Sequence, residues 1–288
     1  MPKTQRIAII GAGLAGLATG YFLSSTCQVT LFDKKGVGGG TSGMAAGLLH
    51  PYVGQTGKMN TFGREGMEAS LPLVKNHILH KGLFRIPINE QMEARFANNP
   101  DFQKRENGYW QEEAYAIDTP AYLHWLTDEI ERNEGDLQIQ TIDDPATLPH
   151  DIVILCQGWQ TPFVQITAVK GQLLEIDATL PYPVAADGYL LPKGNHCILG
   201  STYERNFKTE DPDPSCVAEL LEKGEKMMEG ISNQPIVEIK AGVRASTPQR
   251  LPCVKKIADR IFAYTGLGSR GLLYHALFAK KLIDQLLE

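Results

Sequence analysis

Three glycines and one carboxylate near the start of the chain have the types and spacing of a dinucleotide-binding turn. Gly11 permits a tight turn, Gly13 lets a pyrophosphate approach the backbone, and Gly16 lets a helix pack closely against the preceding strand. A helix that begins here offers free N–H groups and the positive end of its dipole to phosphates. Asp33 stands where a carboxylate would accept a hydrogen bond from a ribose hydroxyl. The pattern predicts that the chain binds a dinucleotide.

The elements that must position these residues follow from the neighbouring sequence. Residues 6–10 are a short apolar run of the kind that forms a strand buried on both faces. A helix follows the glycines, and residues 29–32 form a second strand that ends at Asp33. Because the glycines have a strand before them, a helix after them and an acid at the right distance, the pattern favours a nucleotide site over a chance glycine turn.

A loop dense in glycine follows the acid, with the sequence KKGVGGGTSG over residues 34–43. Such a segment forms neither a helix nor a good strand, so it offers mainly backbone N–H groups and small side chains. It could be only a flexible surface loop. Its position after Asp33 would also let it wrap the rest of a long dinucleotide.

The segment GTSGMAAGLLHP, residues 40–51, resembles the second flavin-contacting segment of the D-amino acid oxidase superfamily of FAD enzymes. The resemblance implies that Thr41 and Ser42 approach the pyrophosphate and that Ala46, Gly47 and Leu48 lie along the flavin. Some relatives with covalently bound flavin have a histidine where this chain has Met44. Non-covalent FAD is therefore implied.

Two later segments carry the same resemblance. Residues 262–272 are similar to the last flavin loop of the family, and the helix that follows would direct its N–H groups and dipole toward the flavin. Residues 241–252 are similar to the family's substrate-facing arginine segment. The sequences of both segments are similar to the oxidase half of the bifunctional enzymes that make 5-methylaminomethyl-2-thiouridine at the tRNA wobble position. That oxidase half oxidises an N-substituted glycine.

The resemblance implies two residues that face the substrate. A planar guanidinium with paired donors suits a carboxylate, so Arg244 is the first candidate for a substrate anchor, against the alternative of a structural arginine. Tyr189 matches a family tyrosine whose hydroxyl faces the substrate, or it is an ordinary strand tyrosine. His50 could modulate protonation of the substrate amine, or serve as a cap or lie in solvent. No residue is assigned as a general base.

The resemblance also assigns the residues that bind the cofactor. The candidate set consists of the glycine turn, the ribose acid, the glycine loop, one glycine after a buried strand and the last flavin loop. Its members are Gly11, Gly13, Leu14, Ala15, Gly16, Asp33, Lys34, Gly40, Thr41, Ser42, Ala46, Gly47, Leu48, Gly158, Gly266, Gly268, Ser269, Arg270, Gly271 and Leu272. The position of Arg270 weakens its assignment, because glycine-oxidase-like relatives place their arginine one residue earlier.

The length of the chain predicts two lobes in an α/β protein. The resemblance implies that one of them is a Rossmann-like FAD-binding domain, with a βαβ unit and a mostly parallel sheet, which would contain residues 1–80, 118–168 and 240–288. A smaller substrate domain with an antiparallel sheet would contain residues 81–117 and 169–239, because short alternating strands dominate the second segment. Within these domains we expect helices over residues 60–80, 118–134, 213–228 and 273–286.

Composition limits the partners and the compartment. A net charge of −5 and a pI near 5.8 offer no general attraction to nucleic acid, so tRNA is an open but not a favoured partner, and a small-molecule amine or amino acid is the simpler substrate. No apolar run is long enough for a membrane span. Five cysteines without a close pair predict free thiols, a cytoplasmic location and no metal site. The oligomeric state is not predicted.

Three functions fit these observations. The first is an FAD-dependent amine oxidase in which the C–N bond of an amino acid or N-substituted glycine is oxidised, the imine is hydrolysed, and oxygen or another acceptor reoxidises the flavin. The second is a shortened flavoprotein that serves as a non-catalytic subunit or electron-transfer partner. The third, a nicotinamide dehydrogenase, shares the glycine turn but gives no purpose to residues 41–47 and 266–272.

Overall fold

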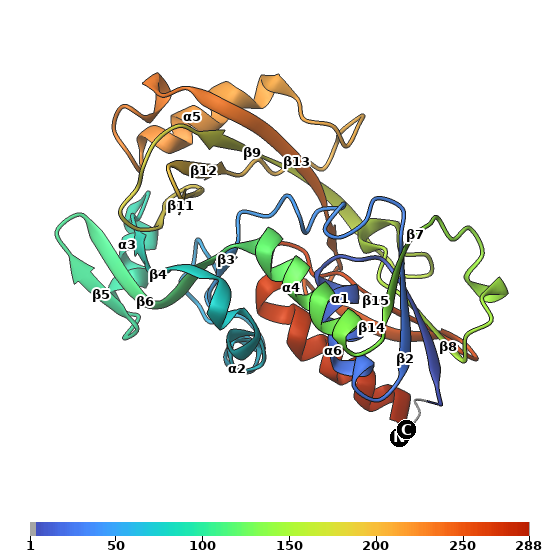
Figure 1. Ribbon diagram of the computed structural model, residues 1–288. Helices are drawn as coiled ribbons and strands as arrows, with labels where there is room; N and C mark the ends of the chain where they lie inside the picture. The colour runs from blue at the N-terminus through green and yellow to red at the C-terminus, as the bar shows by residue number, and fades with distance from the viewer. Residues whose placement is uncertain (1–3, 288) are drawn as a thin grey trace. The chain divides into compact units, whose positions relative to one another are not determined.

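The computed structural model describes residues 4–287 of the chain and divides it into two compact units. The first unit contains residues 1–45, 119–169 and 243–288, and the second contains residues 46–118 and 170–242. Each unit has its own sheet (Figure 1). The α/β class and the combination of a mostly parallel sheet with an antiparallel sheet are confirmed.

A six-stranded sheet forms the centre of the first unit. Its strands, in spatial order, are β14 (Cys253–Ala258), β15 (Ile261–Thr265), β8 (Ile152–Leu155), β1 (Arg6–Ile10), β2 (Gln28–Asp33) and β7 (Asp136–Ile139). Strands β15, β8, β1, β2 and β7 run parallel, and only the edge strand β14 is antiparallel to its neighbour. The chain leaves β1 toward β2 on one side and later returns to β8 on the other. In an open parallel sheet, ligands bind at the carboxyl ends of the strands beside such a reversal.

Helices and loops cover the two faces of this sheet. Helix α1 (Leu14–Ser24) packs against α4 (Thr119–Arg132) and α6 (Gly271–Leu287), as Figure 1 shows. Alternate residues of the strands form an apolar cluster that includes Ala8, Ile10 and Phe32. Both faces of the strands are therefore buried, which explains why residues 6–10 are apolar almost without interruption.

A nine-stranded sheet forms the second unit. Along its path the strands are β13 (Ile236–Ser246), β9 (Thr167–Ile176), β12 (His196–Gly200), β11 (Tyr189–Lys193), β10 (Val184–Ala185), β4 (Ile78–Arg85), β6 (Gly108–Ile117) and β3 (Leu48–Leu49), and β5 (Phe102–Arg105) pairs with β6. From β9 to β3 along this path, and between β5 and β6, neighbouring strands run antiparallel except for β10 with β4, which are parallel. Strands β9 and β13 extend across the boundaries between the two units.

Two apolar clusters stabilise the second unit. Helix α5 (Val217–Glu225) contributes Leu220 to a cluster over β9, β11 and β12. Helix α3 (Glu90–Ala97) contributes Met92 and Phe96 to an aromatic cluster with Tyr52, Phe102 and Tyr109. Helix α2 (Gly63–Val74) buries Met67 and Val74. Short 3₁₀ turns occur at Lys75–His77 and Ile231–Asn233 in this unit, at Pro145–Thr147 and Gly158–Gln160 in the first, and before α5 at Pro214–Cys216.

The structure differs from the sequence prediction in the placement of residues 46–80. These residues, expected in the FAD-binding domain, lie in the second compact unit, because β3 pairs with β6 and β4 begins at Ile78. The helix predicted over residues 60–80 is shorter for the same reason, since the chain enters the sheet after the 3₁₀ turn. The helix predicted over residues 213–228 is likewise limited to α5 and the short turn before it. No helix among residues 4–287 has the length and apolar character that crossing a membrane requires.

Candidate active site

Asp33 is held by backbone N–H groups at the carboxyl end of β2. Its Oδ2 accepts a hydrogen bond from Ala12 N (2.8 Å), and its Oδ1 accepts from Lys35 N (2.8 Å) and Gly36 N (3.1 Å). A carboxylate has about four lone-pair positions, so three amide donors leave acceptor capacity for a ligand hydroxyl. The structure therefore joins the predicted ribose acid directly to the glycine turn.

The glycines of this turn are required by backbone contacts. Gly11 has a φ of +112°, and a Cβ there would lie 2.3 Å from Cys156 O. A Cβ on Gly16 would lie 1.8 Å from Gly11 O, so only glycine allows α1 to begin this close to β1. Gly13 precedes the helix in an extended conformation, without a side-chain cap of its own. Ser42 Oγ instead accepts a hydrogen bond from Leu14 N at 3.0 Å.

Two buried acceptors that sequence reasoning missed lie beyond the carboxyl end of β8. Gln157 Oε1 and Thr161 Oγ1 are buried and make no hydrogen bond within the described part of the chain. They lie on either side of Gly158 in the sequence, and Gly158 was predicted to contact the cofactor. Their closeness to that glycine is the sequence feature that could have identified them. Buried polar groups are normally satisfied. Two unsatisfied oxygens beside the β1/β8 reversal are therefore suited to a polar ligand such as a dinucleotide.

The last predicted flavin loop is tied to β13. Gly268 N donates to Ala245 O at 2.8 Å, and Thr41 Oγ1 donates to Val243 O at 2.5 Å. These two contacts bind the residues on either side of Arg244. Since Val243 and Ala245 are buried and strand residues alternate, the half-buried Arg244 side chain projects from the opposite face of β13. The structure thus brings Thr41, Arg244 and Gly268 together within the first unit.

The start of α6 is fixed beneath this loop by His275. His275 is fully buried, and burial lowers its pKa to about 4 despite hydrogen bonds near the helix start that act the other way. The neutral ring places Nδ1 3.0 Å from Leu272 O, to which it donates, and Nε2 2.6 Å from the Tyr122 hydroxyl, from which it accepts. Gly266 and Gly268 adopt φ values of +84° and +56°, so the turn before α6 needs these two glycines.

The remaining predicted residues of the first unit lie near the same loops. Lys34 Nζ donates to Gln160 Oε1 at 3.0 Å, and Arg270 Nη1 lies 3.4 Å from Arg250 O. Ser269 is exposed, and Leu272 is buried in the first turn of α6. Gly40 has open space around its Cα, since a Cβ would meet nothing within 4 Å. Ala15 is buried in α1.

Four predicted residues lie in the second unit. Gly47 O accepts a hydrogen bond from Ile117 N at 2.7 Å, which fixes the segment of Ala46, Gly47 and Leu48 to the end of β6. Tyr189 is half-buried on β11, opposite Gly200 on β12. A Cβ on Gly200 would lie 2.6 Å from the Tyr189 hydroxyl, so this glycine makes room for the tyrosine side chain.

The first unit provides the features that FAD requires. Backbone donors at the glycine turn, the Asp33 carboxylate and the two unsatisfied oxygens lie at the ends of adjacent parallel strands. Adenosine and ribose groups carry donors for such oxygens, and phosphates accept from backbone N–H groups. The donor set therefore fits a dinucleotide. Within residues 4–287 no three His, Cys, Asp or Glu side chains are grouped as a metal site.

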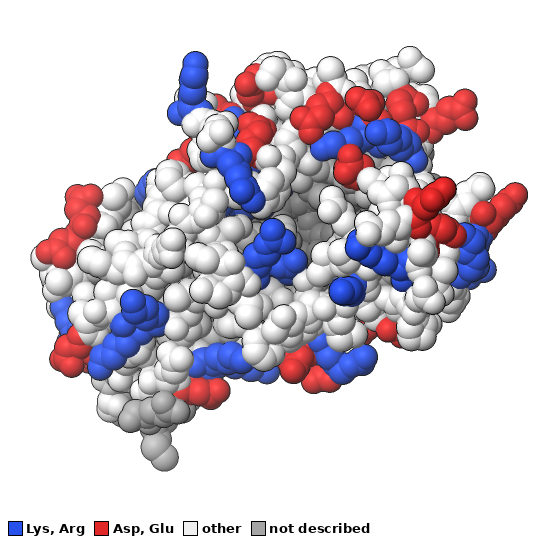
Figure 2. Space-filling view, turned by 180° about the vertical axis from the view of Figure 1, so that it is seen from behind, with Lys and Arg blue, Asp and Glu red and all other residues white. Residues whose placement is uncertain are grey.

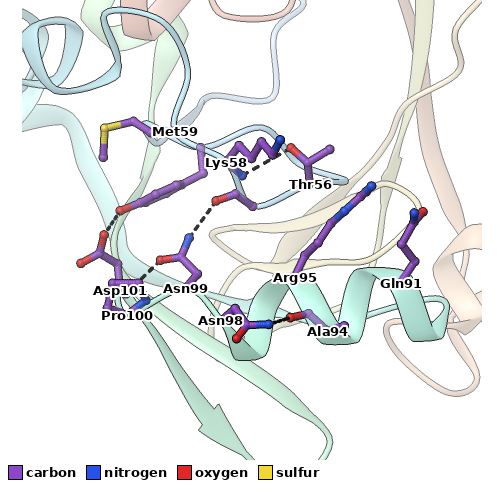
Figure 3. Close-up of a pocket in the computed structure, with 12 residues that line it drawn as sticks. Thr56, Lys58, Met59, Gln91, Ala94, Arg95, Asn98, Asn99, Pro100 and Asp101 are labelled. Carbon is purple, nitrogen blue, oxygen red and sulfur yellow. Dashed lines mark hydrogen bonds between the residues drawn. The ribbon is translucent and has the colours of Figure 1, made fainter.

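A pocket of about 600 Å³ lies in the second unit, between α3 and the loop of residues 52–59. Figure 3 shows the side chains of Arg95 and Gln91 extending from α3 toward the loop that carries Thr56 and Lys58. Tyr52 contributes to the wall and its hydroxyl is hydrogen-bonded to Asp101. None of the predicted site residues lines this pocket.

Comparison with protein families places the chain among flavoenzymes. The model of the FAD-dependent oxidoreductase family matches residues 6–98 and 55–285. Over 315 aligned residues the chain is 26% identical to a tRNA 5-methylaminomethyl-2-thiouridine biosynthesis bifunctional protein from Maricaulis maris, covering 98% of this chain and 52% of the relative. The chain thus spans about half of that relative.

Two further relatives match over nearly their whole length. Human D-aspartate oxidase is 26% identical over 333 residues, with 98% of this chain and 95% of the relative covered. The solved glycine oxidase of Geobacillus kaustophilus superposes with a TM-score of 0.81 at 19% identity, covering 98% of this chain and 94% of the other. The fold predicted from the glycine turn and the flavin segments is thereby confirmed.

Proposed function

We propose, because this chain belongs to the FAD-dependent oxidoreductase family, that it oxidises the C–N bond of an amino acid or an N-substituted glycine. The observation that carries the proposal is the family match itself, which extends through segments of both compact units. The nearly full-length similarity to a D-aspartate oxidase supports this substrate class. A nicotinamide dehydrogenase would share only the glycine turn and would give no purpose to residues 41–47 and 266–272.

The first unit would hold FAD through the residues of the glycine turn. Backbone N–H groups at Gly13 and the start of α1 would face the pyrophosphate, and Asp33 would accept from the ribose. The residues around Gly266 and Gly271 would lie at the flavin. FAD, when bound, supplies the acceptor for the hydrogen and two electrons that leave the C–N carbon. Non-covalent attachment is part of the proposal.

Arg244 is the proposed anchor of the substrate carboxylate. Its fork of N–H donors can bind both carboxylate oxygens, which would orient the C–H bond that reacts. Tyr189 is proposed as a second substrate contact, because its ring is amphipathic and its hydroxyl can donate or accept. Neither residue has to remove a proton from carbon when the reaction is a hydride transfer from a neutral amine.

A free small molecule is the first candidate substrate, and a carboxymethylaminomethyl group on tRNA is the second. The similarity to the Maricaulis maris bifunctional protein favours tRNA. The net charge of −5 gives no general attraction to a phosphate backbone. On the face in Figure 2, Lys and Arg side chains lie among Asp and Glu side chains and form no continuous basic surface.

The alternative of a non-catalytic subunit loses part of its support. It depended on the short length of the chain. The superposition covers 94% of a glycine oxidase chain, so most of that fold is present. The five cysteines have free thiols, four of them buried, which suits a reducing compartment, and a cytoplasmic location remains part of the proposal.

Anaerobic reduction of the bound flavin tests the proposed function. Purified protein would be mixed with glycine, sarcosine, D-amino acids or tRNA that carries carboxymethylaminomethyl-uridine, and loss of the visible flavin absorbance would be followed. We expect rapid reduction by one member of this panel. Arg244→Ala should raise the apparent Kd of that substrate by about 100-fold, because a charge-assisted bidentate contact is lost. Flavin released on denaturation would establish non-covalent binding.

Arg250→Ala is the matched control, because Arg250 is an exposed arginine six residues further along the same segment. It should reduce its flavin as the unaltered protein does. If flavin is bound but no member of the panel reduces it, the subunit alternative is preferred. If the protein binds no flavin under any loading condition, the cofactor assignment is wrong.

A further inference from the structure

The pocket between α3 and the loop of residues 52–59 is preformed. Two backbone hydrogen bonds close the loop, from Val53 N to Lys58 O (2.7 Å) and from Gly57 N to Val53 O (2.9 Å). Asn99 Nδ2 donates to Gly57 O at 2.7 Å, which joins the loop to the segment that follows α3. Both walls belong to the second unit, so the pocket needs no contribution from the first.

Each wall of this pocket carries one cationic side chain. Lys58 extends from the loop and Arg95 extends from α3, as Figure 3 shows. Both residues are exposed, and neither belongs to an ion pair within residues 4–287. The residue one helical turn before Arg95 is Gln91, which is neutral. The two positive charges therefore remain available to a ligand.

One carboxylate lines the same pocket, and it is already engaged. Asp101 accepts a hydrogen bond from the Tyr52 hydroxyl, and Figure 3 shows Asp101 on the far side of the pocket from Arg95. Glu93, an acid close to Arg95 along α3, is paired with Lys104 at 2.5 Å. Two cations and one engaged carboxylate give the lining a net positive charge. The pocket is therefore suited to an anion.

The pocket is larger than a simple anion and has an apolar side. Met59, Ala94 and Pro100 are among its lining residues, and Met59 is 40% exposed. Its volume of about 600 Å³ lies within the range of about 300–1,000 Å³ that is typical of pockets for organic ligands. The methionine thioether also makes favourable contacts with aromatic rings. These features indicate a ligand that joins an anionic group to a flat organic group.

A phosphate suits the two cations better than a carboxylate does. A carboxylate has two oxygens in one plane and a single charge, which one arginine fork can satisfy. A phosphate monoester has about two negative charges at neutral pH and three oxygens that point in different directions. It can therefore accept from both walls at once, from the ammonium of Lys58 and from the planar fork of Arg95.

We propose that this pocket binds the phosphate of a nucleotide between Lys58 and Arg95, with the base against Met59 and Pro100. Thr56 Oγ1 accepts from Lys58 N at 3.3 Å, which leaves its own proton for the ligand. The inference does not rest on the proposed function, because the pocket shares no lining residue with the predicted flavin and substrate sites. The nucleotide is either free or part of an RNA strand, since both carry the same groups.

Titration calorimetry with saturating FAD tests this binding, because FAD keeps the dinucleotide turn occupied. Uridine 5′-monophosphate (UMP) carries both groups, inorganic phosphate carries only the anion, and uridine carries only the base and sugar. We expect UMP to bind at least about tenfold more tightly than either part, and its affinity to fall as salt screens the exposed charges. If UMP binds no more tightly than inorganic phosphate, the proposal is wrong.

Substitution of the two cations locates the binding. Lys58→Gln and Arg95→Gln should each weaken UMP binding by about fivefold to tenfold, because each removes one charged donor. Lys208→Gln and Arg105→Gln are the matched controls, since both residues are exposed cations of the same unit that do not line the pocket. They should bind UMP as the unaltered protein does. Equal losses in controls and pocket variants, or no loss in the pocket variants, would overturn the proposal.

Ala94→Trp tests the place of the base while it keeps both cations. Ala94 is exposed on α3, so a larger side chain there occupies the pocket without entering the apolar core. We expect UMP binding to weaken by about tenfold and inorganic phosphate binding to change by less than about twofold. Unchanged UMP binding in this variant would contradict the position of the base.

A short oligouridylate distinguishes the two sources of the nucleotide. Its internal phosphates carry one charge each, whereas the terminal phosphate of UMP carries about two. Tighter binding of UMP identifies a free nucleotide as the ligand, and tighter binding of the oligouridylate that Arg95→Gln weakens identifies RNA. The proposed function fails separately, when UMP binds as expected but no substrate in the panel reduces the flavin.

Discussion

Two carboxylates, one in each unit, are held by opposite means. Asp33 accepts three hydrogen bonds from backbone amides and is half-buried. Glu175 is 7% exposed and accepts from side chains that carry or can carry positive charge: Lys193 (3.0 Å), Lys240 (2.8 Å) and His196 (3.1 Å). Burial alone would raise the pKa of Glu175, but these three donors lower it to about 2.

The difference separates an acid suited to a ligand from one suited to stability. Neutral amides orient Asp33 without cancelling its charge, so the carboxylate remains an acceptor for a donor from outside. The cations around Glu175 compensate its charge within the unit. A carboxylate with a pKa near 2 is ionised at neutral pH. It therefore has no proton to donate as a general acid. The environment, and not the residue type, distinguishes the two acids.

The strongest test of the backbone-held acid is Gly16→Ala. The added Cβ would lie 1.8 Å from Gly11 O. This oxygen is a backbone atom of the turn after β1, so it cannot move aside at low cost. We expect a loss of at least about 3 kcal/mol in the free energy of unfolding, together with loss of bound flavin. Urea denaturation and flavin content measure the two effects. Gly40→Ala should unfold like the unaltered protein, because its Cβ would meet nothing within 4 Å; equal damage from both would contradict this.

Glu175→Gln tests the side-chain-held acid. The pKa of Glu175 in the folded protein is about 2 against an ordinary 4.5. The interaction therefore stabilises the fold above pH 4.5, and its contribution disappears as pH falls from about 4.5 to about 2. We expect the variant to lose about 2 to 3 kcal/mol at pH 7, and the difference to shrink through that range. Urea denaturation over a pH series measures it.

Glu222→Gln supplies the control, because Glu222 is exposed on α5 and pairs at 3.3 Å with Lys226, the residue that follows the helix. An exposed pair of this kind contributes less than about 0.5 kcal/mol. If the loss in Glu175→Gln stays constant down to pH 2, its cause is packing and not the charge cluster.

The contrast also explains what the sequence could predict. The turn around Asp33 is determined by glycines and an acid at fixed spacing. Strands β1 and β2 have nearly the bounds predicted for them, and α1 lies between them as expected. Helix α4 lies close to the range predicted for it, and α6 was expected because the segment before it resembles the last flavin loop of the family, which opens a helix. Family resemblance, and not spacing, supplied Arg244 and Tyr189, and their roles stay predictions.

The charged groups of the second unit could not be predicted in this way. Arg85, Gln111 and His50 meet only because β3 and β4 both pair with β6, and Glu175 meets Lys193 and Lys240 only through the register of four strands. Such contacts depend on pairings between distant segments. The helix expected over residues 60–80 failed for a related reason, because apolar residues from Ile78 onward pair as a strand instead of continuing the helix.

The smallest expected effect on stability belongs to Asp33→Asn. The amide keeps one oxygen acceptor but turns an NH₂ group toward at least one of the three backbone donors. Since Asp33 is partly exposed and water can reach the displaced donors, we expect a loss of about 1 kcal/mol in urea denaturation of the flavin-free protein. Flavin binding should weaken by about tenfold or more, because the neutral amide is a poorer acceptor for the ribose. Asp143→Asn, at an exposed position of the same unit, should change neither quantity. A large loss of stability with unchanged flavin affinity would reverse the comparison, since Asp33 would then be the structural acid.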